Sequence, residues 1–320
     1  MYYLIVVLTS MQLLIVGINK MSISNISIRL STCANCGKEG SDSDMNTCNK
    51  CKSVKYCNAA CKKKHRSKHK KKCDRRVAEL HDEKLFKQPP PEEDCPICFL
   101  LMPSLWSGDK YMTCCGKLIC SGCIYAGQMT VGGGLCPFCR TPTPTMDDQF
   151  MKHYEKRVEL DDAHAIYDVA CIYSEGKFGC PQNYTKALEL FHRAAELGHS
   201  GAYYNIGNAY LRGKGVQQDM EQARHYWEQA AIRGSVTARC NLGIYEQREG
   251  NMDRALKHWM IAARVGCRTS LRAIKDLFMN GHATKDDYGT ALRAHQAYLD
   301  SIRSDQRDQA AAVSDDFKYY

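Results

Sequence analysis

Cysteines in short, regular pairs dominate one part of this sequence. Fifteen of its 19 cysteines lie in residues 33–139, and ten of these form Cys-x2-Cys pairs, with two residues between the partners. Thiolates at this spacing can converge on one ion, and four cysteine or histidine ligands are typical of a structural zinc site. Disulfides are the other use for many cysteines, but 320 residues far exceed a typical disulfide scaffold. The pairs therefore predict zinc sites in a reducing compartment, the cytoplasm or the nucleus.

The first group of candidate ligands spans residues 33–73. Two Cys-x2-Cys pairs come first, and two pairs spaced four residues apart follow, so each later pair can lie on one helix face. Eight ligands can complete two tetrahedral sites, and His65, which falls between ligand positions, is interpreted as a solvated bystander. The candidate ligands are Cys33, Cys36, Cys48, Cys51, Cys57, Cys61, His69 and Cys73.

Residues 33–73 resemble a MYND zinc finger over its full length, including the aromatic Tyr56 before the fifth ligand. The resemblance implies an adaptor that binds proteins, typically proline-rich ones. It also implies two interleaved sites, Cys33, Cys36, Cys57 and Cys61 for one ion and Cys48, Cys51, His69 and Cys73 for the other. Because so small a module has almost no apolar core, zinc binding would supply much of its folding free energy, roughly 10–16 kcal/mol in finger peptides.

The formal net charge of +9 is concentrated in this module. Residues 33–76 carry 14 Lys plus Arg against 4 Asp plus Glu, and the rest of the chain is close to neutral. The basic run Lys62–Lys72 could serve nuclear import or phosphate binding, but no aromatic residues interleave it to stack on bases. We interpret the run as the solvated face of a ligand-bearing helix and do not expect nucleic acid to be a partner.

A linker, residues 74–94, ends in a proline run and precedes a second group of candidate ligands in residues 95–140. These ligands are Cys95, Cys98, Cys114, Cys115, Cys120, Cys123, Cys136 and Cys139. The pattern resembles a RING finger with one departure: Lys117 stands where the family has its histidine, and a protonated lysine is a poor zinc ligand. The resemblance then implies an all-cysteine variant, with Cys95, Cys98, Cys120 and Cys123 on one ion and Cys114, Cys115, Cys136 and Cys139 on the other. The chain would hold about four zinc ions, two per finger.

The RING resemblance also implies a function. RING fingers have no nucleophile; they position a ubiquitin-charged conjugating enzyme so that attack on its thioester is favoured. In the family an apolar residue and a proline form the docking surface and a basic residue contacts ubiquitin, and Ile97, Pro137 and Arg140 occupy these positions. The segment before Cys136 lacks the tryptophan that many active members use, and Trp106 is interpreted as a packing residue.

The C-terminal half of the sequence repeats itself. After a spacer and capping helix in residues 141–161, an alanine recurs at intervals of 36, 32 and 36 residues as Ala187, Ala223, Ala255 and Ala291. Each of the first three alanines is followed by a bulky ring and then by a closing glycine, which predicts helix–turn–helix units with the rings in the core. Residues 162–300 resemble Sel-like repeats, relatives of the tetratricopeptide repeat, and the resemblance implies a concave face that binds another protein.

The remaining segments give weaker predictions. The cysteines Cys171, Cys180, Cys240 and Cys267 are interpreted as free thiols, and residues 301–320 as a frayed helix with a disordered end. In residues 1–20 the apolar run 2–18 is at the lower length limit for a membrane span. Two interpretations of it stay open: a membrane anchor that leaves the zinc modules in the cytosol, and an over-extended start ahead of a soluble protein that begins at Met21.

The expected fold is multidomain: two small zinc-stabilised modules followed by an all-α helix–turn–helix repeat solenoid. The leading functional hypothesis is a RING-type ubiquitin ligase whose solenoid or MYND finger recruits protein substrates, with a ubiquitin-conjugating enzyme as partner. The alternative is a non-enzymatic scaffold in which both fingers bind proteins.

Overall fold

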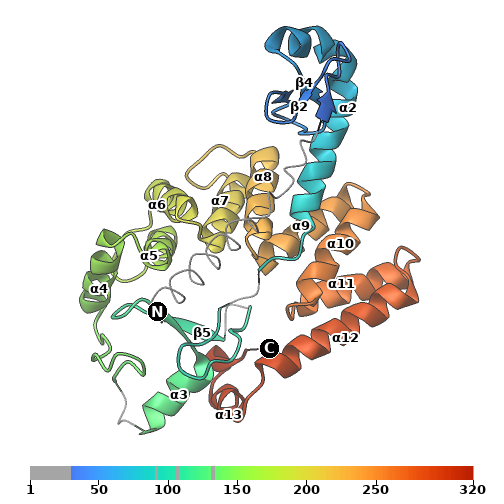
Figure 1. The fold of residues 1–320 in the computed structure, drawn as a ribbon. Coiled ribbons are helices and arrows are strands. Elements are labelled where there is room, and N and C mark those ends of the chain that lie inside the picture. The colour runs from blue at the N-terminus through green and yellow to red at the C-terminus, as the bar shows by residue number, and fades with distance from the viewer. Residues whose placement is uncertain (1–29, 91–92, 105–107, 131–133, 320) are drawn as a thin grey trace, which may run out of the picture. The chain divides into compact units, whose positions relative to one another are not determined.

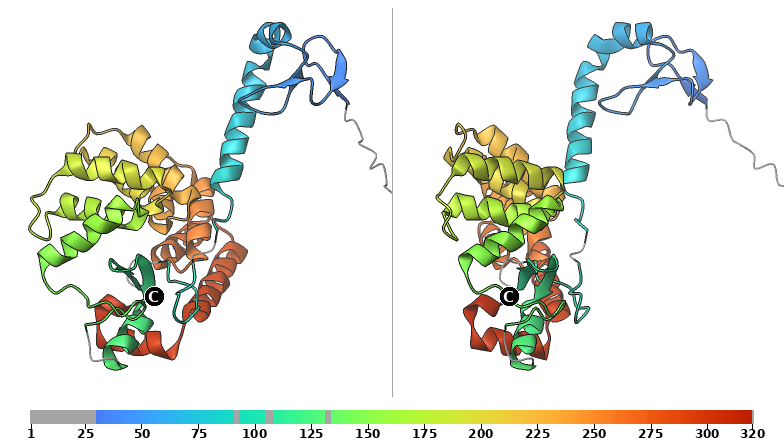
Figure 2. Two further views of the ribbon diagram at one scale, coloured as in Figure 1. Left: turned by 60° about the vertical axis from the view of Figure 1, so that its left-hand side comes forward. Right: turned by 90° about the vertical axis from the view of Figure 1, so that its left-hand side faces the viewer.

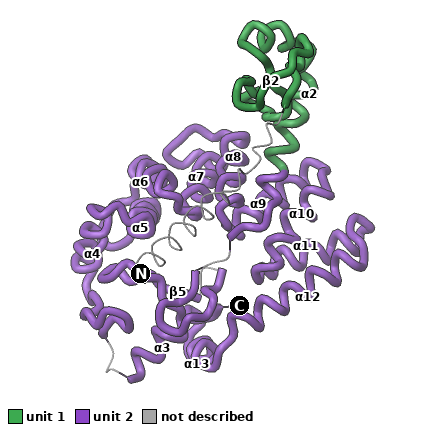
Figure 3. The backbone as a smooth tube through the Cα atoms, in the orientation of Figure 1, with its two compact units in different colours: residues 1–82 green, residues 83–320 purple. Residues whose placement is uncertain are grey.

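The computed structural model describes residues 30–90, 93–104, 108–130 and 134–319. The chain forms two compact units, Met1–Asp82 and Glu83–Tyr320, which Figure 3 colours separately. The apolar run 2–18 and Trp106 lie outside the described residues. Among the helices in the described ranges, none combines the length and the apolar character that crossing a membrane requires.

The first unit consists of short strands and most of one long helix (Figure 1). β1 (Leu30–Thr32) pairs antiparallel with β2 (Glu39–Ser41), and β3 (Asn46–Thr47) pairs with β4 (Lys55–Tyr56). α2 (Ala59–Leu85) follows, and most of its basic run is exposed, as expected for a solvated face. Strand pairs this short cannot stabilise a fold alone. The buried apolar set is mostly candidate ligands: Cys33, Met45, Cys48, Cys51, Tyr56 and Cys73.

In the second unit, the RING-type module, residues 95–140, follows the end of α2 and the proline run. β5 (Asp109–Met112) and β6 (Lys117–Cys120) form an antiparallel hairpin, and α3 (Ser121–Thr130) follows directly. Several cysteines are buried here beside ordinary apolar side chains, among them Met102, Ile119 and Ile124. This module therefore has a small core of its own.

Paired helices make up most of the rest of the second unit and curve through successive repeats (Figure 2). α4 (Asp147–Glu159) precedes them as the predicted capping helix. The pairs are α5 (Ala163–Glu175) with α6 (Tyr184–Glu196), α7 (Ser200–Arg212) with α8 (Met220–Ile232), α9 (Val236–Arg248) with α10 (Met252–Ala263), and α11 (Arg268–Met279) with α12 (Lys285–Ile302). The helical repeat solenoid predicted from the sequence is thereby confirmed.

The repeated residues have the packing roles that were predicted. Phe191, Trp227 and Trp259 are buried between the helices of their pairs. A Cβ atom on Gly207 of α7 would lie 2.5 Å from Trp227 Cδ1, and one on Gly243 of α9 would lie 2.3 Å from Trp259 Nε1. These two glycines let the bulky ring of one helix lie directly on the backbone of the other.

The segment expected to be a linker is partly anchored in the second unit. α2 continues to Leu85, which is fully buried beside Trp227 and Leu242. The buried guanidinium of Arg239 donates to the carbonyl oxygens of Leu85 at 3.0 Å and Lys87 at 3.4 Å. The proline run thus follows an anchored segment, and residues 74–94 are not a spacer throughout.

The prediction of a frayed helix and a disordered end for residues 301–320 is wrong for the described residues. They form α13 (Asp305–Val313) and the 3₁₀ turn η1 (Asp315–Phe317), and α13 packs against α3. Tyr319 is buried. The end of the chain is therefore part of the structure around the RING-type module.

Candidate metal centres

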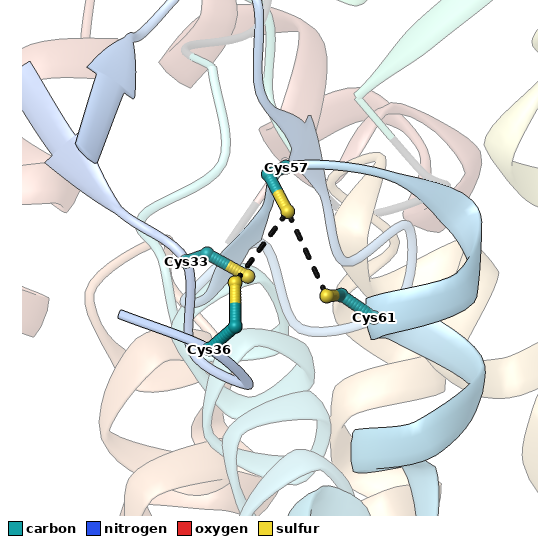
Figure 4. A group of neighbouring side chains, drawn as sticks. All are labelled: Cys33, Cys36, Cys57 and Cys61. Atoms are coloured by element: carbon teal, nitrogen blue, oxygen red, sulfur yellow. Dashed lines mark hydrogen bonds between the residues drawn. The ribbon is translucent and has the colours of Figure 1, made fainter. Parts of the chain in front are cut away.

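The first cluster of candidate ligands joins two segments of the MYND-like module (Figure 4). Cys33 and Cys36 belong to the turn after β1, Cys57 directly follows β4, and Cys61 lies in the first turn of α2. Their four Sγ atoms lie within 4.8 Å of one another. Backbone N–H groups, first that of Cys57, lower the pKa of Cys33 to about 6, which favours the thiolate that a metal needs.

The second cluster uses the same helix two and three turns further along. Cys48 and Cys51 lie between β3 and β4, and His69 and Cys73 meet them from α2. Cys51 Sγ is 3.2 Å from His69 Nε2, and Cys48 Sγ is 3.8 Å from Cys73 Sγ. All four residues are buried.

His65 is not part of either cluster. Its Nδ1 lies 3.2 Å from the Tyr56 hydroxyl, and its ring stacks on His69 with 5.8 Å between the centroids. The side chain therefore packs beside a candidate ligand and is not a fully solvated bystander.

One backbone turn recurs in the Cys-x2-Cys pairs. In four pairs the next residue has a positive φ, and its N–H donates to the carbonyl of the first cysteine at 2.8–3.0 Å. These residues are Gly37, Lys52, Phe99 and Arg140. A positive φ is unusual for Lys, Phe and Arg and persists where the surroundings require it. The shared turn brings both thiols of each pair to one side, as binding to a single ion requires.

The RING-type module brings together the two remaining sets of four cysteines. Cys95 and Cys98 meet Cys120 and Cys123, and Cys114 and Cys115 meet Cys136 and Cys139. In each set the Sγ atoms lie within 4.8 Å of one another. Cys98 Sγ is 3.7 Å from Cys120 Sγ, and Cys114 Sγ is 3.4 Å from Cys139 Sγ.

The hairpin turn explains how two adjacent cysteines converge on one centre. Cys114 and Cys115 stand between β5 and β6, where Met112 pairs with Lys117. Gly116 has φ +68°, and its N–H closes the turn on the Met112 carbonyl at 2.8 Å. Lys117 lies on β6, exposed and outside the cluster. The donors of all four centres, cysteine thiols with one imidazole, fit tetrahedral zinc.

α13, near the C-terminus, packs beside the first of the two RING-type clusters. The fully buried guanidinium of Arg307 donates to the Leu101 carbonyl at 2.9 Å and the Ile302 carbonyl at 2.6 Å. Its Nη2 lies 3.9 Å from Cys98 Sγ. A Cβ atom on Gly122 would lie 2.8 Å from the Arg307 backbone nitrogen, so α13 approaches α3 closely. Sequence reasoning missed Arg307, because an arginine in a polar tail gives no signal of burial.

The three residues singled out for ubiquitin transfer all lie on the RING-type module. Ile97 packs against its core, and Arg140 is exposed. Pro137 lies against α3, because a Cβ atom on Gly127 would be 2.9 Å from Pro137 Cβ. Phe99 and Phe138, which sequence reasoning did not single out, are 76% and 44% exposed. Each lies next to a candidate ligand in the sequence, and this position could have indicated that both belong to the surface of the RING-type module.

Family models match two parts of the chain. The MYND finger model matches residues 33–73, and the Sel1 repeat model matches residues 163–199 and 200–235. The chain thus contains a MYND finger and Sel1 repeats, as the sequence predicted. Both are protein-interaction modules, so proteins are the expected class of partner.

Curated relatives resemble shorter parts of the chain. Chitin synthase regulatory factor 4 of Schizosaccharomyces pombe is 27% identical over 117 residues, 36% of this chain and 18% of that protein. E3 ubiquitin-protein ligase GW2 of Oryza sativa subsp. japonica is 39% identical over 67 residues, 20% and 15% of the two chains. E3 ubiquitin-protein ligase RNF182 of Rattus norvegicus is 30% identical over 110 residues, which cover 33% of this chain and 41% of that protein. The ligase matches fall in the zinc-finger region.

The chain spans less than a quarter of the length of the first curated relatives, at 18%, 22% and 15%. Among solved structures, a Sel1 repeat protein from Oxalobacter formigenes aligns with a TM-score of 0.44 and 25% identity. That alignment covers 56% of this chain and 70% of the other.

Proposed function

We propose that this protein is a RING-type ubiquitin ligase whose Sel1 repeats or MYND finger recruit protein substrates. The observation that carries the proposal is the RING-type module: two cysteine clusters around a β-hairpin and α3. The similarity of the zinc-finger region to E3 ubiquitin-protein ligases supports it. The thiol-rich centres suit a reducing compartment, the cytoplasm or the nucleus.

In this proposal zinc is structural and the chemistry belongs to the conjugating enzyme. The ions would be held by the sixteen residues of the four clusters. Ile97 and Pro137 would dock the conjugating enzyme beside α3. The exposed Arg140 would contact the thioester-linked ubiquitin and restrict it to geometries in which a substrate lysine can attack. The lysine amine displaces the conjugating-enzyme thiol, and the ligase contributes no nucleophile.

Autoubiquitination in vitro tests the proposal. Full-length, zinc-loaded protein is incubated with ubiquitin, activating enzyme and a panel of conjugating enzymes. We expect ubiquitin chains with at least one conjugating enzyme, and a loss of about tenfold or more in Ile97→Ala and Arg140→Ala. Lys117→Ala changes an exposed residue of the same module and is the matched control. Folded protein with four zinc ions that forms no chains with any conjugating enzyme would rule out the ligase.

The second candidate is a non-enzymatic adaptor in which both zinc modules bind proteins. One observation favours it: the relative from Schizosaccharomyces pombe, similar over 36% of this chain, is named a regulatory factor. The same assay separates the two candidates. An adaptor would retain protein partners in a pull-down but would produce no ubiquitin chains.

A further inference from the structure

A cavity of about 770 Å³ lies inside the second unit, between the RING-type module and the solenoid. Asp109, Tyr111 and Lys117 line it from the β-hairpin. The solenoid side is lined by the first turns of α5, α7 and α9, including His164, Ser200 and Val236. The volume is in the range of ligand-binding cavities in proteins, roughly 300–1,000 Å³.

Five aromatic rings follow one another along the wall of this cavity. Tyr154 stacks with Tyr111 at 6.5 Å between centroids, and Tyr111 with His164 at 5.6 Å. His164 meets His199 at 4.5 Å, and His199 stacks on Tyr167 at 4.2 Å. Burial lowers the pKa of His199 to about 3 and also lowers that of His164, so both imidazoles are neutral at pH 7. None of these rings carries a positive charge that would repel a cation, and neutral aromatic rings can attract one.

Asp168 adds a carboxyl group to the same wall. Its one hydrogen bond in the described structure comes from the Tyr154 hydroxyl at 3.0 Å, and no described lysine or arginine forms an ion pair with it. The nearby Asp162, by contrast, accepts from the Tyr111 hydroxyl at 2.7 Å and lies 3.8 Å from Arg157. Burial raises the pKa of Asp168 to about 7. A carboxylate in this position is costly until a cation approaches it.

Among the residues that the structure describes, the cations nearest to Asp168 do not fill this position. The guanidinium of Arg233 lies over the Tyr203 ring, 4.1 Å from its centroid, and donates to the Gln229 carbonyl at 2.9 Å. Lys110 and Lys117 line the cavity from exposed positions on the hairpin. A second depression of about 320 Å³ shares Tyr167 with the cavity and is lined by Asn205 and Asn208. This depression could hold the residues that flank a bound side chain, and its side-chain amides could form hydrogen bonds with a peptide backbone.

We propose that this cavity binds a lysine or arginine side chain of an extended protein segment, with Asp168 opposite the charge and the aromatic wall around it. The inference rests on the proposed function, for which it names a substrate class: proteins that present a basic residue in an unfolded or flexible segment. Recognition would take place beside the RING-type module, which brings the captured protein close to the conjugating enzyme.

Peptide binding tests this inference without ubiquitin or conjugating enzyme. The probe is acetyl-Gly-Ser-Lys-Ser-Gly-amide, and arginine, norleucine or glutamate replaces the lysine in three further peptides. Binding to full-length, zinc-loaded protein is followed by NMR titration. We expect the lysine and arginine peptides to bind at least about tenfold more tightly than the norleucine peptide, which keeps the methylene chain but lacks the charge. Equal binding of lysine and norleucine peptides would overturn the inference.

Variants locate the site. Asp168→Asn should weaken the lysine peptide about tenfold, whereas Asp148→Asn, which changes an exposed carboxylate on α4, should leave binding unchanged. Unchanged lysine binding in Asp168→Asn would refute the assignment to this cavity. Free lysine amide that binds as tightly as the peptide would refute recognition of an extended segment. The comparison of lysine with norleucine needs no variant and stands even if Asp168→Asn folds poorly. If the protein makes ubiquitin chains but binds the charged and uncharged peptides equally, this inference is wrong and the proposed function still stands.

Discussion

The two zinc modules differ in what surrounds their candidate ligands. In the MYND finger the buried apolar set consists mainly of the ligands themselves. In the RING-type module the cysteines share a core with Met102, Ile119 and Ile124. Two further segments tie that module to the rest of its unit. Arg307 of α13 donates to the Leu101 carbonyl, and the Ser104 N–H donates to the Tyr298 hydroxyl at 2.7 Å.

The difference concerns what zinc does in each module. Where ligands are the core, metal binding and folding are the same event. Where protein surrounds the ligands, the metal completes a structure that other contacts partly hold. A module held in this way keeps a defined position beside the solenoid, and the proposed ligase function would require this in order to bring substrate and conjugating enzyme together.

Loss of one MYND ligand should have the largest effect. Cys48→Ser removes a ligand from the second cluster, and residues 30–82 should unfold because zinc supplies about 10 kcal/mol or more of the finger's folding free energy. Hydrogen exchange should show lost protection there and unchanged protection in the solenoid. Cys180→Ser makes the same change outside the four clusters and should keep four zinc ions. Preserved protection of residues 30–82 in Cys48→Ser would contradict the comparison.

Removal of the Arg307 side chain on α13 should have the next largest effect, confined to the second unit. Arg307→Ala leaves the carbonyls of Leu101 and Ile302 without this donor and should cost about 3 kcal/mol of that unit's unfolding free energy. Urea unfolding measures the cost, and a chromophoric chelator reports faster zinc release from the RING-type module. Arg303→Ala, at a side chain 70% exposed, is the control. Equal stability of the two variants would mean that the tail does not support the module.

Asp168→Asn should have a smaller effect that depends on pH. The pKa of Asp168 is raised from 3.8 to about 7 in the folded protein, so between these values the unfolded state binds fewer protons and stability falls as pH rises. Asparagine lacks this titration. The melting temperature of the variant relative to wild type should therefore increase from pH 5 to pH 8. In terms of the free energy of unfolding, we expect the difference between variant and wild type to change by about 1–2 kcal/mol over this pH range. This is less than the full pKa shift implies, because Asp168 is partly exposed. A difference independent of pH would count against a carboxyl group whose pKa is raised in the folded protein.

Lys117→Ala should have no effect on metal content. Lys117 lies outside the cluster, whereas Cys114 and Cys115 both belong to it. Elemental analysis should find four zinc ions per chain in the variant and in wild type. Three ions in the variant would show that the lysine position contributes to the second RING-type centre.

Local features of the fold could be predicted from the sequence. Ligand spacing identified both zinc modules, because each Cys-x2-Cys pair makes its own turn. The repeated rings Phe191, Trp227 and Trp259 identified the solenoid core, because each is buried at the same position of its repeat.

The long-range features could not be predicted. Arg239 and Arg307 look like surface charges in the sequence, and their buried partners lie 154 and 206 residues away. The cavity around Asp168 likewise joins residues of the hairpin and of three repeats. Cys240 and Cys267, interpreted as unrelated free thiols, lie with their Sγ atoms 3.0 Å apart across successive repeats. In each case the contact is made by the tertiary arrangement and leaves no periodic pattern in the chain.

Stepwise zinc removal tests the central comparison most directly. A chelator is titrated into full-length protein while native mass spectrometry counts bound zinc and hydrogen exchange follows each module. We predict two steps: two ions leave as residues 30–82 lose protection, and the other two leave at higher chelator concentration, with the solenoid still protected. Release of all four ions in one step, or loss of the RING-type ions first, would contradict the account.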